Sequence, residues 1–215
     1  MDLLGKGGSE LVIDCSSSDL KVAVGSYNPK NKTVSIEKVG VIPLEQDAIN
    51  DGAIADSFGI VMAVKHAVAR LDIRCKNCTI TTDGAFVHTR DLELPVVKAD
   101  QLKDMVKYEI MGQGSNRDLS IDYLVYGTAI DEETNVEKLK VRATALPTEK
   151  IKDFREFLKS MDLTPIALDV NQNAVRKLFS SGIINGNVSI AQSTLLLIEL
   201  SSQTSTVTVL DKGFP

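Results

Sequence analysis

The chain has 215 residues, of which 43% are hydrophobic and 25% charged, and its formal net charge at pH 7 is −5. This length allows one or two domains, and the hydrophobic fraction is sufficient for a packed core. The net negative charge, without a basic stripe, argues against nucleic-acid binding. The sequence has neither an apolar run long enough to span a bilayer nor a charged and then apolar leader, so we expect a cytoplasmic protein.

The first third of the chain is predicted to form strands followed by a helix. Hydrophobic residues mark short strands at residues 11–14, 20–26 and 33–41. The polar turns that separate these strands predict an antiparallel meander. Asp56 or Ser57 is placed to cap a helix that carries Ile60, Val64 and Leu71 on one face.

The middle of the chain is predicted to form an inserted block at about residues 78–163, with the element order ββαββα. Its first two strands lie on either side of Asp83-Gly84, a dipeptide that favours a tight hairpin turn. Leu102 belongs to the apolar face of the first helix, and Pro147 is well placed in the first turn of the second. Strands and helices without strict alternation predict an α/β or α+β fold.

The chain ends in a strongly apolar hairpin, with predicted strands at residues 194–200 and 206–210. A two-stranded hairpin alone is only marginally stable in water. We therefore expect its third strand and its covering helices beyond Pro215, and we interpret the chain as part of a longer protein.

Three cysteines give an odd count. Cys75 and Cys78 form a Cys-x-x-Cys motif, which is typical of half a zinc site or of a redox pair. Besides Cys15, the chain offers only His66 and His88 as further nitrogen or sulfur ligands. We favour reduced thiols at a helix–strand junction.

Two strand–turn–strand units combine an acidic residue at a strand end with a turn rich in hydroxyl groups. A carboxylate there can hold magnesium through water, and the turn can present N–H groups and hydroxyls to phosphate oxygens. Lys21 follows the first turn. The candidate nucleotide-binding residues are Asp14, Ser16, Ser17, Ser18, Lys21, Glu199, Ser201 and Thr204.

An ordered series of segments resembles the PilM family of actin-like type IV pilus assembly proteins, and the related family FtsA. The series consists of DGAIAD at 51–56, FVHTRDLELP at 86–95, VKYE at 106–109, IDY at 121–123, RATA at 142–145 and MDLTPIALDV at 161–170. No single segment is decisive, but their order and spacing are, and the resemblance covers nearly everything from Leu11 to Pro215.

The resemblance implies an actin-like, ribonuclease H-like lobe with an inserted subdomain of the FtsA and PilM type. It assigns residues 1–77 and 164–190 to subdomain IA, residues 78–163 to the inserted subdomain IC, and residues 191–215 to the start of a second lobe. ATP and magnesium are then expected only in the full-length protein, and no cofactor in this chain.

Three positions depart from the family's phosphate turns. Ser16 and Ser201 stand where glycine is usual, and Glu199 stands where aspartate is usual. A side chain hinders the close phosphate approach that glycine permits. We therefore expect a binding platform and not an enzyme.

The family implies a cytoplasmic scaffold, peripheral at the inner face of the cytoplasmic membrane. Its expected partners are the cytoplasmic N-terminal peptide of a PilN-type membrane protein, held in a groove beside the inserted subdomain, and the pilus motor ATPases. Self-association into rings is also expected.

Two alternatives remain open at this stage. An ATPase or sugar kinase of the same superfamily would need glycine-rich phosphate turns and a second lobe. An FtsA-like membrane tether of cell division would need an amphipathic C-terminal helix. Leu94-Pro95 and the layout of the inserted block favour the PilM family.

Overall fold

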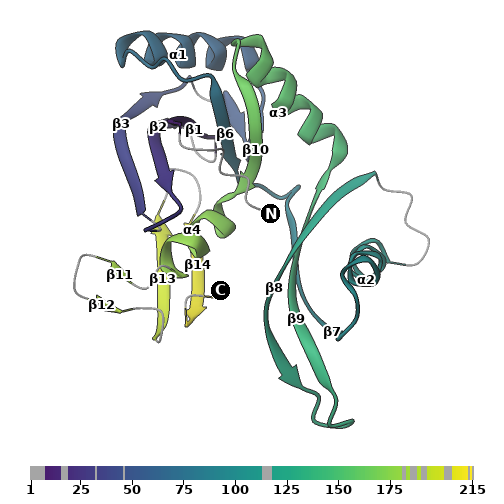
Figure 1. Cartoon of the computed structure of the whole chain (residues 1–215). Helices are drawn as coiled ribbons and strands as arrows, with labels where there is room; N and C mark the ends of the chain where they lie inside the picture. The colour runs from purple at the N-terminus through teal and green to yellow at the C-terminus, as the bar shows by residue number, and fades with distance from the viewer. Residues whose placement is uncertain are drawn as a thin grey trace. The chain divides into compact units, whose positions relative to one another are not determined.

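The computed structural model describes residues 8–15, 19–31, 33–45, 47–112, 118–180, 183–184, 188–189, 193–200, 205–212 and 214. The chain divides into two compact units (Figure 1). Unit 1 contains Met1–Gly84 and Asp153–Pro215, and unit 2 contains Ala85–Lys152. The predicted mixture of strands and helices is confirmed.

Unit 1 is built on a five-stranded mixed sheet with the order β10-β6-β1-β2-β3. Its strands are β1 (Glu10–Asp14), β2 (Asp19–Asn28), β3 (Thr33–Pro43), β6 (Asn77–Thr82) and β10 (Thr164–Val170). The first three form the predicted antiparallel meander, whereas β6 runs parallel to both β1 and β10. The carboxyl ends of β1, β6 and β10 therefore lie at one edge of the sheet.

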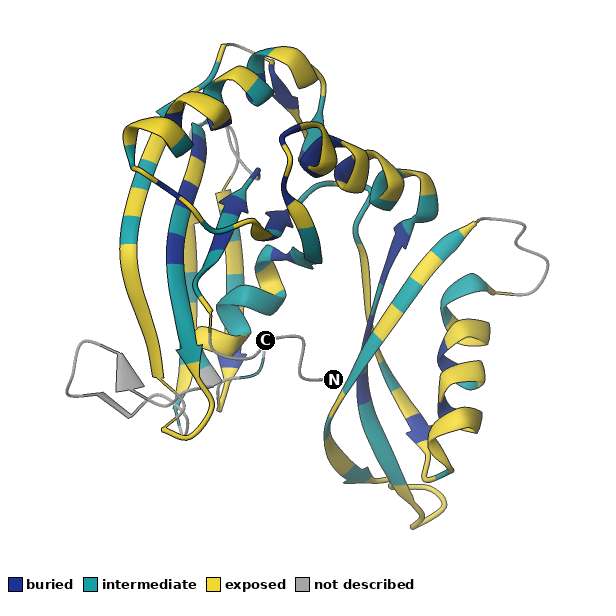
Figure 2. Ribbon diagram, turned by 45° about the horizontal axis from the view of Figure 1, so that its top comes forward, coloured by how far each residue is buried: buried dark blue, intermediate teal, exposed yellow. Residues whose placement is uncertain are grey.

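The core of unit 1 lies on one face of this sheet, where alternate residues of β1 and β2 are buried (Figure 2). Leu11 and Ile13 of β1 are fully buried, and they pair in register with Val24 and Val22 of β2. Ile80 of β6 lies opposite Ile13 and extends the same apolar face. This alternation is the period-2 pattern that predicted the strands.

Three helices belong wholly or partly to unit 1: α1 (Ser57–Arg70), α3 (Thr148–Ser160) and α4 (Asn171–Ser180). Asp56 caps α1, since its Oδ1 accepts a hydrogen bond from the N–H of Gly59 at 3.0 Å. Ile60 and Val64 of α1 are fully buried, as the helical spacing predicted.

Short strands complete unit 1. β4 (Ile49–Asn50) pairs with β5 (Ala53–Ile54), and β11 (Ile183–Ile184) pairs with β12 (Val188–Ser189). The predicted terminal hairpin is present as β13 (Thr194–Leu200) and β14 (Ser205–Asp211), which form a two-stranded sheet of their own.

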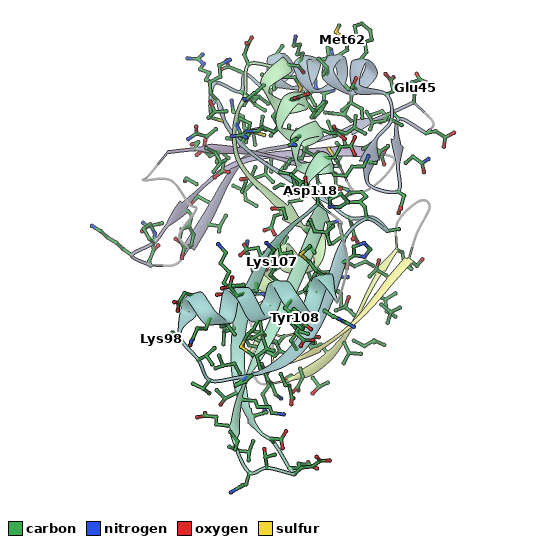
Figure 3. The ribbon with its side chains drawn as sticks, turned by 90° about the vertical axis from the view of Figure 1, so that its right-hand side faces the viewer. Glu45, Met62, Lys98, Lys107, Tyr108 and Asp118 are labelled. Carbon is green, nitrogen blue, oxygen red and sulfur yellow. The ribbon has the colours of Figure 1, made fainter. Side chains whose placement is uncertain are left out.

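Within the described residues, unit 2 contains a three-stranded antiparallel sheet with the order β7-β9-β8, one complete helix and the start of α3. Its elements are β7 (His88–Pro95), α2 (Ala99–Met111), β8 (Leu119–Ile130) and β9 (Glu137–Pro147). Lys107 and Tyr108 lie on the outer side of α2, where the Tyr108 side chain is largely exposed (Figure 3).

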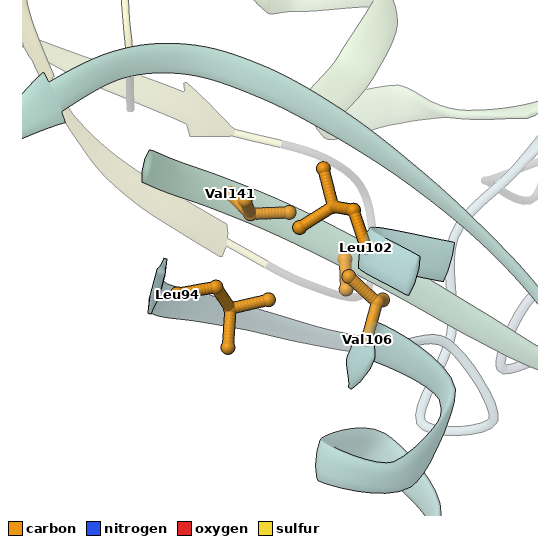
Figure 4. Packing of buried hydrophobic residues seen from close by; sticks show 5 residues of the cluster. Leu94, Leu102, Val106 and Val141 are labelled. Atoms are coloured by element: carbon orange, nitrogen blue, oxygen red, sulfur yellow. The ribbon is translucent and has the colours of Figure 1, made fainter. Parts of the chain in front are cut away.

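The inner side of α2 packs on the sheet of unit 2 and forms a separate core. This core consists of Leu94, Leu102, Val106, Val141 and Ala143 (Figure 4). Unit 2 therefore has its own apolar centre, as an inserted subdomain requires.

The sheet pairing differs from the sequence-based expectation at the start of the inserted block. The predicted hairpin at Asp83-Gly84 is wrong, because β6 pairs with β1 and β10 while β7 pairs with β9. The expected order ββαββα is present from β6 to α3, but its first strand belongs to the sheet of unit 1. Long-range parallel pairing of β6 outweighs the local turn preference.

Candidate functional site

The candidate site lies at the edge of the five-stranded sheet where β1, β6 and β10 end. In register, Asp14 of β1 lies beside Thr81 of β6, and Thr81 lies beside Asp169 of β10. Ligands of open α/β sheets bind at the carboxyl ends of parallel strands. This is the edge at which the sequence predicted a phosphate-binding turn.

Asp14 is held by two neighbours. Its Oδ2 lies 3.5 Å from Nζ of Lys21, and its Oδ1 accepts a hydrogen bond from the Thr81 hydroxyl at 3.3 Å. The side chain of Asp14 is 25% exposed and that of Lys21 is 52% exposed. The structure thus brings these two predicted site residues together, because antiparallel pairing places them opposite each other.

Asp83 is a further acidic residue at this edge, and the sequence analysis did not select it. Its partial burial raises the pKa of the carboxyl group, and the nearby charges of Asp51 and Asp14 raise it further. A hydrogen bond from the N–H of Gly84 acts in the opposite direction and lowers the pKa. Asp83 therefore lies close enough to Asp51 and to Asp14 for the charge of each to act on its carboxyl group.

The loop at Gly52 closes tightly on the end of β6. Gly52 has φ +73°, and a Cβ at this position would lie 1.6 Å from the backbone oxygen of Asp83. Its carbonyl accepts a hydrogen bond of 2.8 Å from the buried hydroxyl of Thr82. The glycine of the segment 51–56 is thus required by backbone conformation and by space.

Asp169 anchors the start of α4. Its Oδ1 accepts a hydrogen bond of 2.7 Å from the side-chain amide of Asn173, and its Oδ2 pairs with Nζ of Lys177 at 2.6 Å. The only sequence signal for this residue was its place in the family-like segment 161–170.

The remaining predicted site residues are not assembled with Asp14 by the described part of the structure. Ser16, Ser17, Ser18, Ser201 and Thr204 lie outside the described residues. Glu199 is described, and it lies exposed on β13 opposite Thr206, in a sheet separate from β1. Within the described residues, no group of three or more His, Cys, Asp or Glu side chains is arranged to hold a metal ion.

The three cysteines are free thiols, and two of them are inaccessible. Cys15 and Cys78 are fully buried, whereas Cys75 is partly exposed. Burial raises the pKa of Cys78 to about 12, with smaller contributions from Glu10 and Cys75. The Cys-x-x-Cys motif therefore lacks the lowered pKa of a catalytic redox pair.

A second candidate surface is the edge of the unit 2 sheet formed by β8. Among the strands that the structure describes, β8 pairs with β9 alone, and it contains a single charged residue, Asp122. Val125 is 40% exposed and Ile130 is 58% exposed, so apolar surface is available along it. The opposite edge strand, β7, carries three charged residues and ends in proline, which are features that protect an edge from pairing.

The sheet of unit 1, with its edge of acidic residues, and the separate inserted unit define an actin-like fold. The chain belongs to the family of type IV pilus assembly protein PilM, whose model matches residues 12–214. The predicted family and fold are confirmed, and the family functions in type IV pilus assembly.

One solved structure has a similar fold, and a second is less similar. A chain of the "PilM-PilN type IV pilus biogenesis complex" has a TM-score of 0.73 and 15% sequence identity, and the match covers 94% of this chain and 58% of that chain. The cytoplasmic domain of EpsL, an inner-membrane component of the type II secretion system of Vibrio cholerae, has a TM-score of 0.49 and 13% identity, with 94% and 71% covered. None of the curated protein sequences is significantly similar to this chain.

The chain spans 58% of the length of the matched chain in that complex. No helix among the described residues is both long enough and apolar enough to cross a membrane.

Proposed function

We propose that this chain is a scaffold of type IV pilus assembly that binds the cytoplasmic N-terminal peptide of a PilN-type membrane protein. The observation that carries the proposal is the family match over residues 12–214, joined with the fold similarity to a PilM chain whose complex contains PilN. Binding of this kind needs a surface and not a catalytic group.

The surface that supports peptide binding best is β8. An extended peptide that lies beside an edge strand forms backbone hydrogen bonds with it, which give affinity. Every second side chain of the peptide contacts the surface of the sheet, which gives specificity. β8 is long, low in charge and partly apolar at Val125 and Ile130. We place the peptide along this strand of unit 2.

The wider setting follows from the same proposal. A protein that holds the cytoplasmic end of a membrane protein lies at the inner face of the cytoplasmic membrane. We also propose that the protein contacts the pilus motor ATPases and assembles into rings, because the family resemblance implies both.

Nucleotide binding is the second candidate function, and the carboxylates near Asp14 are the observation that favours it. Asp14 is engaged by Lys21 and Thr81, and a magnesium-bound phosphate would have to compete with both. We propose that peptide binding by this chain needs neither ATP nor magnesium. Isothermal titration calorimetry with ATP and magnesium should show no saturable heat, and a heat signal that is lost in Asp14→Ala would contradict this.

Fluorescence anisotropy tests the peptide proposal. The probe is a labelled N-terminal peptide of the cognate PilN-type protein, titrated with the wild-type chain and with Asp14→Ala. Both should bind with equal affinity without ATP, since Asp14 lies in unit 1 and the proposed surface lies in unit 2.

A pair of matched variants locates the surface. Val125→Asp on β8 should weaken peptide binding roughly tenfold, which corresponds to about 1.4 kcal/mol. Thr89→Asp makes the same charge change on the exposed edge strand β7 and should leave the affinity unchanged. Absence of binding by the folded wild type would reject the scaffold function, whereas equal binding by Val125→Asp would reject only the β8 site.

A further inference from the structure

A pocket of about 230 Å³ lies in unit 1, at the opposite ends of β6 and β10 from the acidic edge. The last turns of α1 and the loop at residues 72–76 form one side of it. Met161 and Leu163, which follow α3, form the other side. This pocket is separate from the acidic edge of the sheet and from the β8 surface.

The floor of the pocket is apolar and firmly packed. Val64 is fully buried, and Ile73, Met161 and Leu163 are each less than 10% exposed. A backbone hydrogen bond also joins the two sides of the pocket, since the N–H of Thr164 donates a 2.8 Å hydrogen bond to the carbonyl of Lys76. A hydrophobic group that entered here would meet a preformed surface.

The rim of the pocket is cationic, although the chain as a whole carries a net charge of −5. Arg74 pairs through both Nε and Nη2 with the carboxylate of Asp72, at 3.1 Å each. Lys65 and Lys76 are exposed, and neither forms an ion pair within the described residues. Among the residues that line the pocket, Lys65, Arg74 and Lys76 outnumber the acidic Asp72. Glu37 and Glu10 lie near Cys75 and raise its pKa, whereas Lys38 lowers it.

We propose that this pocket binds a short acidic peptide segment of a partner protein through one large apolar side chain. The pocket volume lies below the roughly 300–1,000 Å³ of small-molecule pockets, which favours a single anchoring side chain. Buried anchors of this type carry most of the energy of a peptide interface. Lys65 and Lys76 then pair with acidic residues on either side of the anchor, which gives specificity and a dependence on salt.

Cys75 provides a direct reporter, because it lines the pocket and is partly exposed while Cys15 and Cys78 are buried. The probe is the peptide acetyl-EEFEE-amide, and the readout is the rate of alkylation of Cys75 by iodoacetamide, followed by mass spectrometry. Saturating peptide should slow this alkylation roughly tenfold, and acetyl-KKFKK-amide should not slow it.

Two variants of equal charge complete the test. Lys65→Glu/Lys76→Glu should abolish the protection of Cys75 by acetyl-EEFEE-amide. Lys103→Glu/Lys107→Glu should retain it, because both lysines are exposed on α2 in unit 2. Because the readout is a thiol in the pocket, a misfolded variant is recognised by alkylation of Cys15 and Cys78.

Four outcomes would overturn the proposal. The first is no protection of Cys75 in the wild type. The second is equal protection by acetyl-EEGEE-amide, which would mean that no apolar anchor is bound. The third is equal loss of protection in both charge variants. The fourth is protection by vesicles containing phosphatidylglycerol but not by the peptide, which would assign the pocket to an anionic membrane surface.

Discussion

Carboxylates gather at the edge of the unit 1 sheet, and each has its own compensating group. Asp14 pairs with Lys21, Asp83 accepts a hydrogen bond from the N–H of Gly84, and Asp169 pairs with Lys177. Like charges that approach each other without such partners raise the pKa of one another. Burial raises the pKa of Asp83, and the charges of Asp51 and Asp14 raise it further.

The buried thiols predict a loss of stability at alkaline pH. Burial raises the pKa of Cys15 and, from 9.0 to about 12, that of Cys78. Below pH 9 the folded and unfolded chains both keep these protons. Above it the unfolded chain releases protons that the folded chain retains, so the free energy of unfolding falls by about 1.4 kcal/mol per pH unit for each thiol.

Urea unfolding between pH 8 and 10.5 measures this loss. In the Cys15→Ala/Cys78→Ala variant, the free energy of unfolding should fall less steeply with pH than in the wild type. The two thiols are gone, and only the titration of lysine and tyrosine remains. Identical slopes would contradict the burial of these thiols. Alkylation at pH 8 provides a check, since only Cys75 should react before unfolding.

At the residue scale, local pattern predicted Asp14 and Lys21 but not their acidic neighbours. A short turn between two antiparallel strands places residues on either side of it opposite each other, so this pair is readable from the sequence. Asp83 and Asp169 reach the site only because β6 and β10 pair in parallel with β1 across long stretches of chain. No local signal encodes that pairing.

Among the elements, α1 and α3 end with the same backbone motif. Asp72 and Asp162 follow the two helices in left-handed conformation, with φ of 47° and 58°. After α3, the N–H of Leu163 donates a 3.2 Å hydrogen bond to the carbonyl of Leu158, which is the long bond of a Schellman motif. The strand that follows each helix in the chain is β6 after α1 and β10 after α3.

Substitution of Asp162 tests this ending of α3. Asp162→Gly should raise the free energy of unfolding by roughly 0.5–1 kcal/mol, because glycine adopts positive φ without steric cost. Asp162→Val should lower it by about 1–2 kcal/mol, because a β-branched residue is strongly disfavoured there. Chemical denaturation measures both, and a variant pair with equal stability would contradict the left-handed conformation.

The core of unit 2 is the second test at the scale of elements. Leu102→Ala should destabilise the packing of α2 on its sheet by roughly 2–4 kcal/mol, since Leu102 is 5% exposed in this core. Lys103→Ala, one residue later and exposed, should change stability by less than about 0.5 kcal/mol. Hydrogen exchange of α2 amides measures the effect within unit 2, and equal exchange in the two variants would argue against a separate core.

The sequence predicted which segments form helices and strands better than it predicted which strands pair with one another. The hydrophobic spacing located α1, α2 and the terminal hairpin, because burial on one side imposes period 3.6 or period 2. The hairpin predicted at Asp83-Gly84 was wrong, because a turn dipeptide indicates only the local backbone conformation that it favours. The strand before it is held by two parallel neighbours, and that pairing determines where unit 2 begins.

At the scale of the whole molecule, several exposed large apolar side chains follow one another on β3 and on the terminal hairpin of unit 1. They are Val34, Ile36, Val39 and Val41 on β3, and Leu196, Ile198, Leu200, Val207 and Val209 on the terminal hairpin, each at least 56% exposed. Monomeric proteins rarely expose large contiguous apolar patches. The expectation that further elements cover the hairpin stays a prediction.

Hydrogen–deuterium exchange of the chain, with and without the N-terminal peptide of its cognate PilN-type protein, tests whether β8 receives the peptide. Strand addition protects amides of the strand that receives the peptide. We predict slower exchange along β8 (Leu119–Ile130) at saturating peptide without ATP, and unchanged exchange in β1 and β2. Unchanged exchange throughout unit 2, or slowing confined to β1 and β2 at the edge that carries Asp14, would contradict the account.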